Sequence, residues 1–529
     1  MPGMMRLFLV ATFLTVTACS MMRADSPTPI PTPTTVRVVQ TTPVPTLNRQ
    51  MQAVSTSQPA LGEATEAPTE AAPVPACDDP QALPSAKHVV TATLTFREQA
   101  ISAEQTTSYV NRTGEALTQL VFDVEANRRP GVFTLESLTL VDGTPVPAFE
   151  LAGRKLTVDL VEPLGEGCRL DLKSSFSVKI PQIDAGINGY TGYFGFSARQ
   201  INLAHWLPAV AVRSTGEWLV HDSVNVGEQT VLDPADWDIT LTVNGASDQL
   251  LVVGPGEASQ PEPTTWRFVN AGVRDMPLTM SEHYHRTTAQ TEQGVTVELY
   301  CFEDAQVEVD GGGAHDGAAH ALDVATRAVS MYSDLFGPYP RDRFIVVQGD
   351  FPDGMEFSDL VFVSGDWFRS YNGLPTSYLT LITIHEVSHQ WWYSRVGNDQ
   401  ALTPWLDESL ATYSEYVFYE EYYPDLKDWW WQFRVDTWIP PNFDDRSVAS
   451  TVYEFASIRE YINAVYLRGA RMLRDLRTDL GTELFFEWLA KYAEAGADQI
   501  ATADLFWSLL TDEQTEWTRE TREKYLGGS

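Results

Sequence analysis

The first patterned part of the chain, from about residue 89 to residue 297, alternates apolar and polar positions with a period of two. One such run places threonines between Val90, Ala92, Leu94 and Phe96. Alternation of this kind indicates strands with one face buried and the other in water. The run at 238–243 repeats the pattern and leads into Asn244-Gly245, a pair favoured in tight turns. We therefore predict an N-terminal antiparallel β domain, a sandwich or saddle, over residues 85–285.

Beyond residue 318 the apolar positions recur at helical spacing instead. They include Leu322, Val324, Ala325, Ala328, Val329 and Tyr332. The pair Gly337-Pro338 is expected to end this helix, short apolar strands are expected at 344–347 and 360–363, and helices follow as far as residue 507. The mixture predicts a second, α+β domain over residues 286–529. The predicted fold class is thus α+β and multidomain.

The beginning of the chain indicates export rather than folding. Arg6 precedes an apolar run over residues 7–16, which has the length of a signal-peptide core and is too short to span a bilayer as a helix. The run ends in Val-Thr-Ala-Cys19, which resembles the bacterial lipobox, in which the cysteine is lipidated. The alternative is an ordinary signal peptide that contains a cysteine. We predict a lipoprotein signal peptide over residues 1–19, and an extracytoplasmic, cell-surface or membrane-anchored bacterial lipoprotein.

Residues 20–84 are expected to form a disordered tether. From residue 26 onward this segment is dominated by Pro, Thr, Ala and Glu and has hardly any large apolar residue, so it cannot form a core. Proline-rich chain favours extended polyproline geometry, at about 3.1 Å per residue. The tether would hold the folded part away from the membrane.

Charge and cysteine content narrow the function further. The chain has 71 acidic and 36 basic residues, a net charge of −35, which repels phosphate backbones and excludes nucleic acid as an expected partner. Four cysteines are too few for a disulfide scaffold or a cysteine-ligated metal. Cys301 lies in an alternating apolar run and is interpreted as a small buried hydrophobe. Cys77 and Cys168 can pair if the compartment is oxidising.

The candidate chemistry lies in the segment 381–392, which contains the motif HExxH in a helix-compatible setting. His385 and His389 are four residues apart, so both imidazoles lie on one helix face and can reach one ion. Zinc suits two nitrogen ligands plus a carboxylate, with the fourth position left to water. Glu386 is then the base that accepts the proton of that water. With 9 histidines in 529 residues, a chance HExxH has a probability on the order of one per cent.

Glu408 is the candidate third ligand. It lies nineteen residues after His389, in the sequence WLDE, on a second predicted helix. The alternative interpretation is a solvated carboxylate at a helix start. A metzincin pattern is excluded, because it needs a glycine and a histidine where this chain has Trp392 and Arg395.

HExxH followed after eighteen residues by a glutamate within WLDE resembles the gluzincin aminopeptidase family, which includes aminopeptidase N and leukotriene hydrolase. The segment 353–357, DGMEF, is similar to that family's GxMEN segment, an edge strand that pairs with substrate. The resemblance implies substrate binding by Gly354, Met355 and Glu356, with Glu356 on the free N-terminal amine. The segment 464–470, AVYLRGA, is similar to the YxKGA motif, and implies that the Tyr466 hydroxyl stabilises the tetrahedral oxyanion.

Three departures from the family pattern bear on specificity. Phe357 replaces an asparagine, and Arg468 replaces a lysine with the charge kept. Family members supply a second Gln or Glu to the amine from the N-terminal domain, and Gln200 is the candidate in this chain. The chain ends at Ser529, before the C-terminal helical domain of larger relatives would fit, so an open site is expected.

The predicted function is that of a zinc-dependent metallopeptidase with one zinc ion per chain, which removes N-terminal residues from peptides. Two alternatives stay open at this stage: a zinc endopeptidase with an open cleft, and a peptide-binding lipoprotein on an inactive peptidase fold. Retention of Glu386 and Tyr466, neither of which is needed to bind metal, favours the enzyme. The expected partners are peptide substrates and, through the lipid on Cys19, a membrane.

Overall fold

The structure is a computed structural model that describes residues 36–38, 77, 85–183, 192–309, 313–439, 443 and 446–527. The predicted signal peptide with Cys19, and nearly all of the predicted tether, lie outside the described residues. All of the described residues belong to one compact unit. Among the residues that the structure describes, no helix has the length and apolar character needed to cross a membrane.

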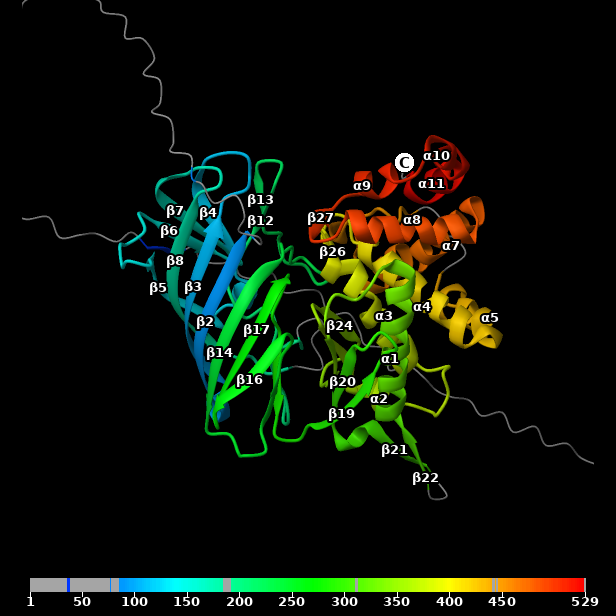
Figure 1. Cartoon of the computed structure of the whole chain (residues 1–529), viewed down its shortest axis with the longest axis horizontal. Coiled ribbons are helices and arrows are strands. Elements are labelled where there is room, and N and C mark those ends of the chain that lie inside the picture. Colours follow the sequence, from blue (N-terminus) through cyan, green and yellow to red (C-terminus); the bar gives the residue numbers. More distant parts are fainter. Residues whose placement is uncertain are drawn as a thin grey trace, which may run out of the picture. The chain divides into compact units, whose positions relative to one another are not determined.

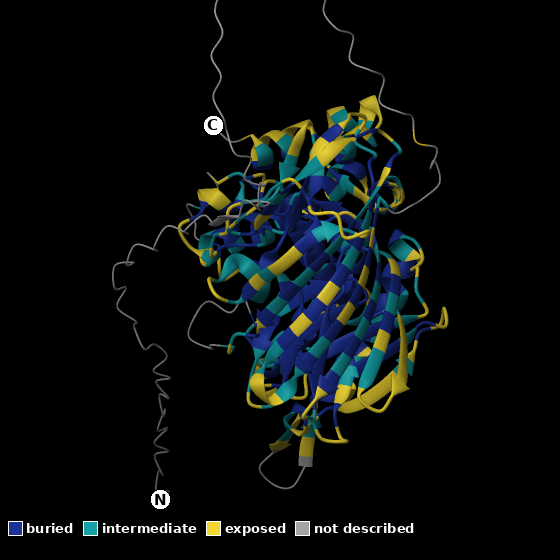
Figure 2. Cartoon of the chain, turned by 90° about the vertical axis from the view of Figure 1, so that its left-hand side faces the viewer, coloured by how far each residue is buried: buried dark blue, intermediate teal, exposed yellow. Residues whose placement is uncertain are grey.

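The N-terminal region is built on a seven-stranded sheet with the order β16-β17-β14-β2-β3-β8-β5 (Figure 1). Its strands are β2 (Ala86–Thr95), β3 (Ala100–Val110), β5 (Phe133–Leu140), β8 (Arg169–Lys179), β14 (Ala235–Asn244), β16 (Glu257–Glu262) and β17 (Thr265–Val273). Buried and more exposed residues alternate along the long strands, as the period of two predicts (Figure 2). The pairing is antiparallel except between β2 and β14, which run parallel.

Smaller sheets complete this region. One contains β1 (Val36–Val38), β6 (Phe149–Ala152), β7 (Lys155–Leu164), β4 (Leu117–Asp123) and β11 (Ala209–Val210). A second contains β15 (Leu251–Val253), β18 (Leu278–Ser281), β10 (Ile201–Leu203) and β9 (Phe194–Phe196), and β12 (Val212–Ser214) pairs with β13 (Glu217–Leu219). Their inward residues share one core, in which Phe176, Leu203 and Trp206 are fully buried. Each such side chain stabilises the fold by about 2 to 3 kcal/mol.

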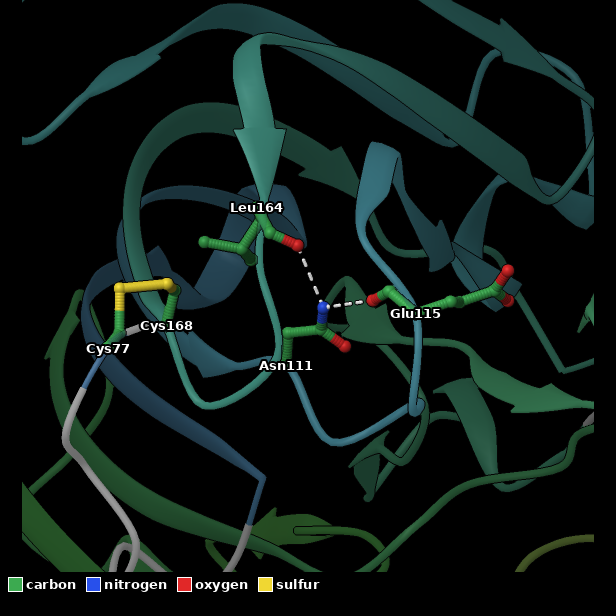
Figure 3. The surroundings of a disulfide bond; sticks show 5 residues. All are labelled: Cys77, Asn111, Glu115, Leu164 and Cys168. Carbon is green, nitrogen blue, oxygen red and sulfur yellow. Dashed lines mark hydrogen bonds between the residues drawn. A yellow bond between two sulfur atoms is a disulfide. The ribbon is translucent and has the colours of Figure 1, made fainter. Parts of the chain in front are cut away.

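A disulfide joins Cys77 to Cys168, so the pairing that the sequence left open is present (Figure 3). Cys168 directly precedes β8, and nearby the Asn111 side chain donates to the carbonyls of Leu164 and Glu115 at 2.8 and 2.7 Å. The bond closes a loop of 91 residues. Restricting the unfolded chain over such a length is worth about 4.6 kcal/mol in the chain-entropy model. Cys301, at the end of the strand Thr296–Cys301, is a buried free thiol, as predicted.

The C-terminal region begins with a five-stranded sheet of order β19-β20-β23-β25-β24. The strands are β19 (His285–Gln290), β20 (Thr296–Cys301), β23 (Arg343–Gly349), β25 (Leu360–Ser364) and β24 (Gly354–Phe357). Strands β20, β23 and β25 are parallel, and β24 is an antiparallel edge strand. Two short pairs accompany it, β21 (Gln306–Val309) with β22 (Gly313–Asp316), and β26 (Val396–Asn398) with β27 (Gln499–Ala501). The edge position of β24 leaves one side of its backbone unpaired in the sheet.

Helices make up most of the remainder (Figure 1). They are α1 (Gly317–Phe336), α2 (Gly365–Arg369), α3 (Tyr378–Ser388), α4 (Trp405–Tyr422), α5 (Lys427–Trp430), α6 (Ile458–Tyr461), α7 (Arg468–Leu480), α8 (Thr482–Ala495), α9 (Ala503–Ser508), α10 (Asp512–Trp517) and α11 (Arg519–Leu526). The Asp316 side chain caps α1, and Gly337 ends it at a φ of 102°. Helix α3 is buried all round over 379–388, which is why its sequence lacks a polar face.

One buried arginine connects the β region to the segment that follows α3. The guanidinium of Arg274 donates to the carbonyls of Tyr393, Leu232 and Gln499 at 2.7, 2.8 and 2.8 Å. The residue is only 1% exposed. Three chain segments that are far apart in sequence therefore meet at the Arg274 side chain. One of them, at Tyr393, lies four residues after His389, the second histidine of the HExxH motif.

Candidate active site

Helices α3 and α4 bring His385, His389 and Glu408 together. Glu408 Oε2 lies 3.2 Å from His385 Nε2 and 3.7 Å from His389 Nε2. Ligand atoms around a tetrahedral zinc ion are about 3.3 to 3.6 Å apart, given metal–ligand distances of about 2.0 to 2.2 Å. All three residues are buried, with at most 5% of each exposed. Two imidazole nitrogens and one carboxylate in this arrangement fit a zinc ion.

Each imidazole is oriented by its other nitrogen. His385 Nδ1 lies 2.9 Å from Glu415 Oε1, and His389 Nδ1 donates to the carbonyl of Trp392 at 2.9 Å. Glu415 follows Glu408 by seven residues, two turns of α4, so both carboxylates lie on one helix face. These contacts direct both Nε2 atoms toward Glu408 and fix the ring orientation that a metal requires.

Electrostatics in this cluster favour a cation. Burial disfavours charge on His385, but hydrogen bonds and attraction from Glu408 and Glu415 outweigh it and raise the pKa of His385 to about 10. Burial also opposes ionisation of Glu408, but its contacts with His385, His389 and the Tyr466 hydroxyl hold its pKa below the usual range. A metal ion that binds here takes the place of the imidazolium proton.

Glu386 is the candidate base. It is 5% exposed, and its Oε2 atom has no hydrogen-bond partner among the described residues. Burial, followed by the charges of Glu408 and Asp353, raises its pKa well above that of a free carboxyl, although His385 opposes the shift. A carboxyl with a raised pKa in a cleft is suited to accept and return a proton.

The edge strand β24 packs directly against this base. A Cβ atom on Gly354 would lie 2.1 Å from Glu386 Oε1, so no residue with a side chain fits without moving the carboxyl group. The next residue, Met355, is 6% exposed and packs into the core of the β region. The glycine therefore lets the strand backbone approach the reacting groups closely.

Tyr466 faces the same cluster. Its ring stacks on His385 with a centroid distance of 5.8 Å and an interplanar angle of 4°, and its hydroxyl is hydrogen-bonded to Glu408. It lies in the π-helical turn η10 (Ile462–Leu467), which joins α6 to α7. Such turns change the direction of the side chains on a helix and are frequent at functional sites.

A second group of carboxylates lies beside the metal ligands. One oxygen from each of Glu228, Glu356 and Glu408 lies within 4.8 Å of the others. Glu356 accepts a hydrogen bond from Gln400 Nε2 at 3.1 Å. Burial and then Glu408 raise the pKa of Glu228 to about 8, and burial together with Glu228 raises that of Glu356 well above its usual value. An ammonium group would relieve this repulsion.

Glu228 comes from the β region, and the sequence analysis did not identify it. It lies in the connection between β13 and β14, where Gln229 Nε2 donates to the carbonyls of Val226 and Gly227 at 2.9 and 2.6 Å. Gly227 has a φ of 61°, and a Cβ there would lie 2.9 Å from the Tyr461 hydroxyl. No motif or spacing marks this glutamate, so only the expectation of a second acidic or amide group from the N-terminal region pointed to it.

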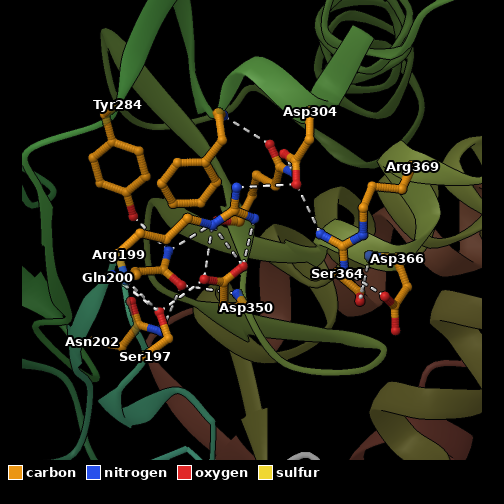
Figure 4. Close-up of polar contacts among 12 residues, drawn as sticks. Ser197, Arg199, Gln200, Asn202, Tyr284, Asp304, Asp350, Ser364, Asp366 and Arg369 are labelled. Carbon is orange, nitrogen blue, oxygen red and sulfur yellow. Dashed lines mark hydrogen bonds and ion pairs between the residues drawn. The ribbon is translucent and has the colours of Figure 1, made fainter. Parts of the chain in front are cut away.

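Gln200, the candidate for that role, is placed elsewhere (Figure 4). It is 2% exposed, its Nε2 donates to the Gln348 carbonyl at 2.9 Å, and its Oε1 accepts from the Asp350 amide at 2.9 Å. Arg199 binds the Asp350 carboxylate beside it. The prediction for Gln200 is therefore corrected: both of its polar atoms are used to hold the loop that leads into β24.

The site opens into a cleft, whose empty space together with the adjoining open solvent is about 780 Å³. Its lining combines the groups described above with apolar or aromatic residues: Tyr193, Phe351, Met355, Ile382 and Ile462. The apolar lining would contact the side chains of a bound peptide.

The fold and this site define the class of protein: a gluzincin-type arrangement with HExxH on one helix and the third ligand on the next. Residues 320–524 match the Peptidase family M1 domain. The chain is similar to aminopeptidase M1-B of Oryza sativa subsp. japonica, 28% identical over 221 residues, which are 38% of this chain and 25% of that protein. It is 28% identical over 242 residues to aminopeptidase N of Lactobacillus delbrueckii subsp. lactis, which are 42% of this chain and 27% of that protein.

Solved structures extend the likeness to the whole fold. An M1 zinc metallopeptidase from Deinococcus radiodurans aligns with a TM-score of 0.60 and 18% identity, over 84% of this chain and 94% of that one. A variant of the same protein was solved with a Tyr-Ser-Ala substrate. The chain spans about a quarter of the length of the curated relatives that it matches. These comparisons confirm the predicted resemblance and fold class, and they agree with the prediction of a zinc metallopeptidase.

Proposed function

We propose that this protein is a zinc metallopeptidase that removes N-terminal residues from peptides. One observation carries the proposal: a His-His-Glu metal site, with Glu386 beside it, lies next to the carboxylates of the half-buried Glu228 and the buried Glu356. The first part supports hydrolysis, and the second supports recognition of a free amine. The match to the Peptidase family M1 domain over residues 320–524 supports both.

The residues have separate tasks in this proposal. His385, His389 and Glu408 hold one zinc ion per chain, which when bound polarises the scissile carbonyl and acidifies water. Glu386 takes the proton of the attacking water and passes it to the leaving amine. The Tyr466 hydroxyl donates a hydrogen bond to the oxyanion, and because it stacks on His385 it lies beside the ligand cluster.

Substrate orientation follows from β24 and the neighbouring carboxylates. The free backbone edge of β24 pairs with the substrate as an additional strand, and Gly354 brings that edge close to Glu386. Glu356 and Glu228 accept charge-assisted hydrogen bonds from the N-terminal ammonium, which fixes the first peptide bond at the metal. A blocked N-terminus would leave the buried Glu356 and the half-buried Glu228 without a cationic partner, and this favours an aminopeptidase over an endopeptidase.

We also propose that the protein works outside the cytoplasm, anchored by a lipid on Cys19. The disulfide between Cys77 and Cys168 supports an oxidising compartment, in agreement with the export signal in the sequence. Metabolic labelling with a fatty-acid analogue tests the anchor: label is expected on the wild type and not on Cys19→Ala. Equal labelling of both proteins would contradict it.

The activity is tested with aminoacyl fluorogenic amides beside N-terminally acetylated peptides of the same sequence. We expect zinc-dependent cleavage of free-amine substrates, no cleavage of acetylated ones, and loss of activity on chelation that zinc restores. Cleavage of the acetylated peptides at equal rates would replace the aminopeptidase with an endopeptidase. No cleavage of either set, despite bound zinc, would reject a peptidase.

A further inference from the structure

We propose that Arg434 is a positioning residue for the metal site, which acts on the ligand His385 through Glu415. The inference rests on the proposed function only in that His385 binds zinc. It assigns a role to a residue that no motif in the sequence marks and that lies in a different helix from every metal ligand.

Glu415 is the link between the two residues. Its side chain is fully buried on α4, and Oε1 lies 2.9 Å from His385 Nδ1. The same Oε1 accepts from Arg434 Nη2 at 2.8 Å, while Oε2 accepts from Arg434 Nε at 2.9 Å and from Trp430 Nε1 at 3.3 Å. Both carboxylate oxygens are therefore held in place by groups other than the histidine.

The geometry of Arg434 is suited to this task. The Nε and Nη2 donors bind the two oxygens as a fork, which fixes the rotation of the carboxylate as well as its position. The side chain is 13% exposed and lines the cavity of the site. It projects from a π-helical turn, η7 (Trp431–Asp436), directly after α5. A lysine, with one compact ammonium group, cannot form the same fork.

The consequence concerns the ring of His385. Without Arg434, only His385 and Trp430 would hold the Glu415 carboxylate, which could then rotate and let the imidazole turn away from Glu408. The buried charge of Glu415 would also lose the arginine that balances it. Removing such an orienting contact typically weakens metal binding about 10- to 100-fold. Among the described residues, Arg434 contacts Glu415 and makes no hydrogen bond or ion pair with a metal ligand, so its effect passes through Glu415.

The same helix offers a matched control. Arg477 binds Glu420 on α4, with Nη1 2.7 Å from Oε2, and 15% of its side chain is exposed. Both pairs join an arginine to a buried or half-buried glutamate of α4, but Glu420 does not contact a metal ligand in the described contacts. A merely structural ion pair on α4 would give the same result at both positions.

The test compares zinc affinity in the full chain for the wild type, Arg434→Gln, Arg434→Lys and Arg477→Gln. Each protein is stripped of metal, its folding is checked by circular dichroism, and zinc binding is measured by competition with a chromophoric chelator. We expect Arg434→Gln to bind zinc about 10- to 100-fold more weakly, Arg434→Lys to lie between it and the wild type, and Arg477→Gln to match the wild type. At saturating zinc, kcat is expected to fall in Arg434→Gln with KM little changed.

Unchanged zinc affinity in folded Arg434→Gln would overturn the inference, and so would an equal loss in Arg477→Gln. If Arg434→Gln does not fold, Arg434→Lys decides, since weaker zinc binding supports the inference and wild-type binding overturns it. Failure of the wild type itself to bind zinc would reject the proposed function instead, which keeps the two failures distinct.

Discussion

The protein contains two groups of buried or half-buried acidic side chains that differ in how their charge is balanced. In the β region, Asp123 and Glu125 both contact Arg154, and the side chains of all three are at most 7% exposed. Beside the metal site, Glu228, Glu356 and Glu386 form no ion pair with a lysine or arginine in the described part of the chain. Because Glu125 also pairs with Arg128, the first group is neutralised by the chain itself, and the second is left to ligands.

Two buried histidines also differ in the charge of their surroundings. His88, in the β region, stacks on Trp237 and contacts Thr107, and burial among such neutral groups lowers its pKa to about 3. His385 is equally enclosed, but the two carboxylates beside it raise its pKa to about 10. Burial alone therefore does not mark a functional residue. A buried group in a cleft whose pKa is shifted by neighbouring charges is a much better mark of function.

Removing the base should give the largest effect. Glu386→Gln keeps the size of the side chain but cannot accept a proton, so kcat should fall by up to about 10⁴-fold. Zinc binding should stay at the wild-type level, because Glu386 is not among the three ligands. Steady-state kinetics together with metal analysis checks both parts, and a variant with more than a tenth of wild-type kcat would remove Glu386 from the proposed mechanism.

Removing the cation of the β region should affect stability instead. Arg154→Met leaves the buried Asp123 without its arginine and Glu125 with Arg128 alone, and should lower the free energy of unfolding by about 3 to 5 kcal/mol. Denaturant unfolding of the variant beside the wild type measures it. Glu228→Gln is the contrasting change, since it removes an unbalanced charge and should leave stability equal or higher. Equal losses in both variants would erase the distinction between the two acidic groups.

Glu228→Gln should instead weaken substrate binding. The loss of one charged acceptor for the ammonium should raise KM for free-amine substrates about tenfold, with a smaller change in kcat. Kinetics on aminoacyl amides gives both constants. An unchanged KM would mean that Glu356 alone holds the amine.

The smallest expected effect is a pH dependence of stability from His88. Its pKa is lower in the folded protein than the unfolded value of about 6.5, so the unfolded chain takes up a proton first as pH falls. The stability that the fold has with His88 neutral is therefore fully present above pH 6.5, and the free energy of unfolding should be reduced by about 1 kcal/mol at pH 5.5. The difference between wild type and His88→Gln, measured by unfolding at both pH values, should show it. A difference that does not change with pH would contradict the assignment.

Local spacing in the sequence was enough to predict the fold class and the two histidines of the metal cluster. A period of two identified strands such as β2 and β14, and a period of 3.6 identified α1, because burial on one face imposes these repeats directly. His385 and His389 could be paired for the same reason, since four residues on a helix place both rings on one face. Glu408, Glu356 and Tyr466 came from longer motifs that resemble a known family.

Only the tertiary structure decided which distant residues complete the site. Glu228 and Arg434 lie on a loop and a π-helical turn far from HExxH in sequence, and no periodicity relates such segments to one another. The prediction for Gln200 was wrong in a different way. Its residue type and region fit the expected role at the substrate amine, but its side chain holds the loop that leads into β24. Helix and strand repeats are local consequences of backbone geometry, whereas contacts between a β-region loop and a helical cleft depend on how whole elements pack.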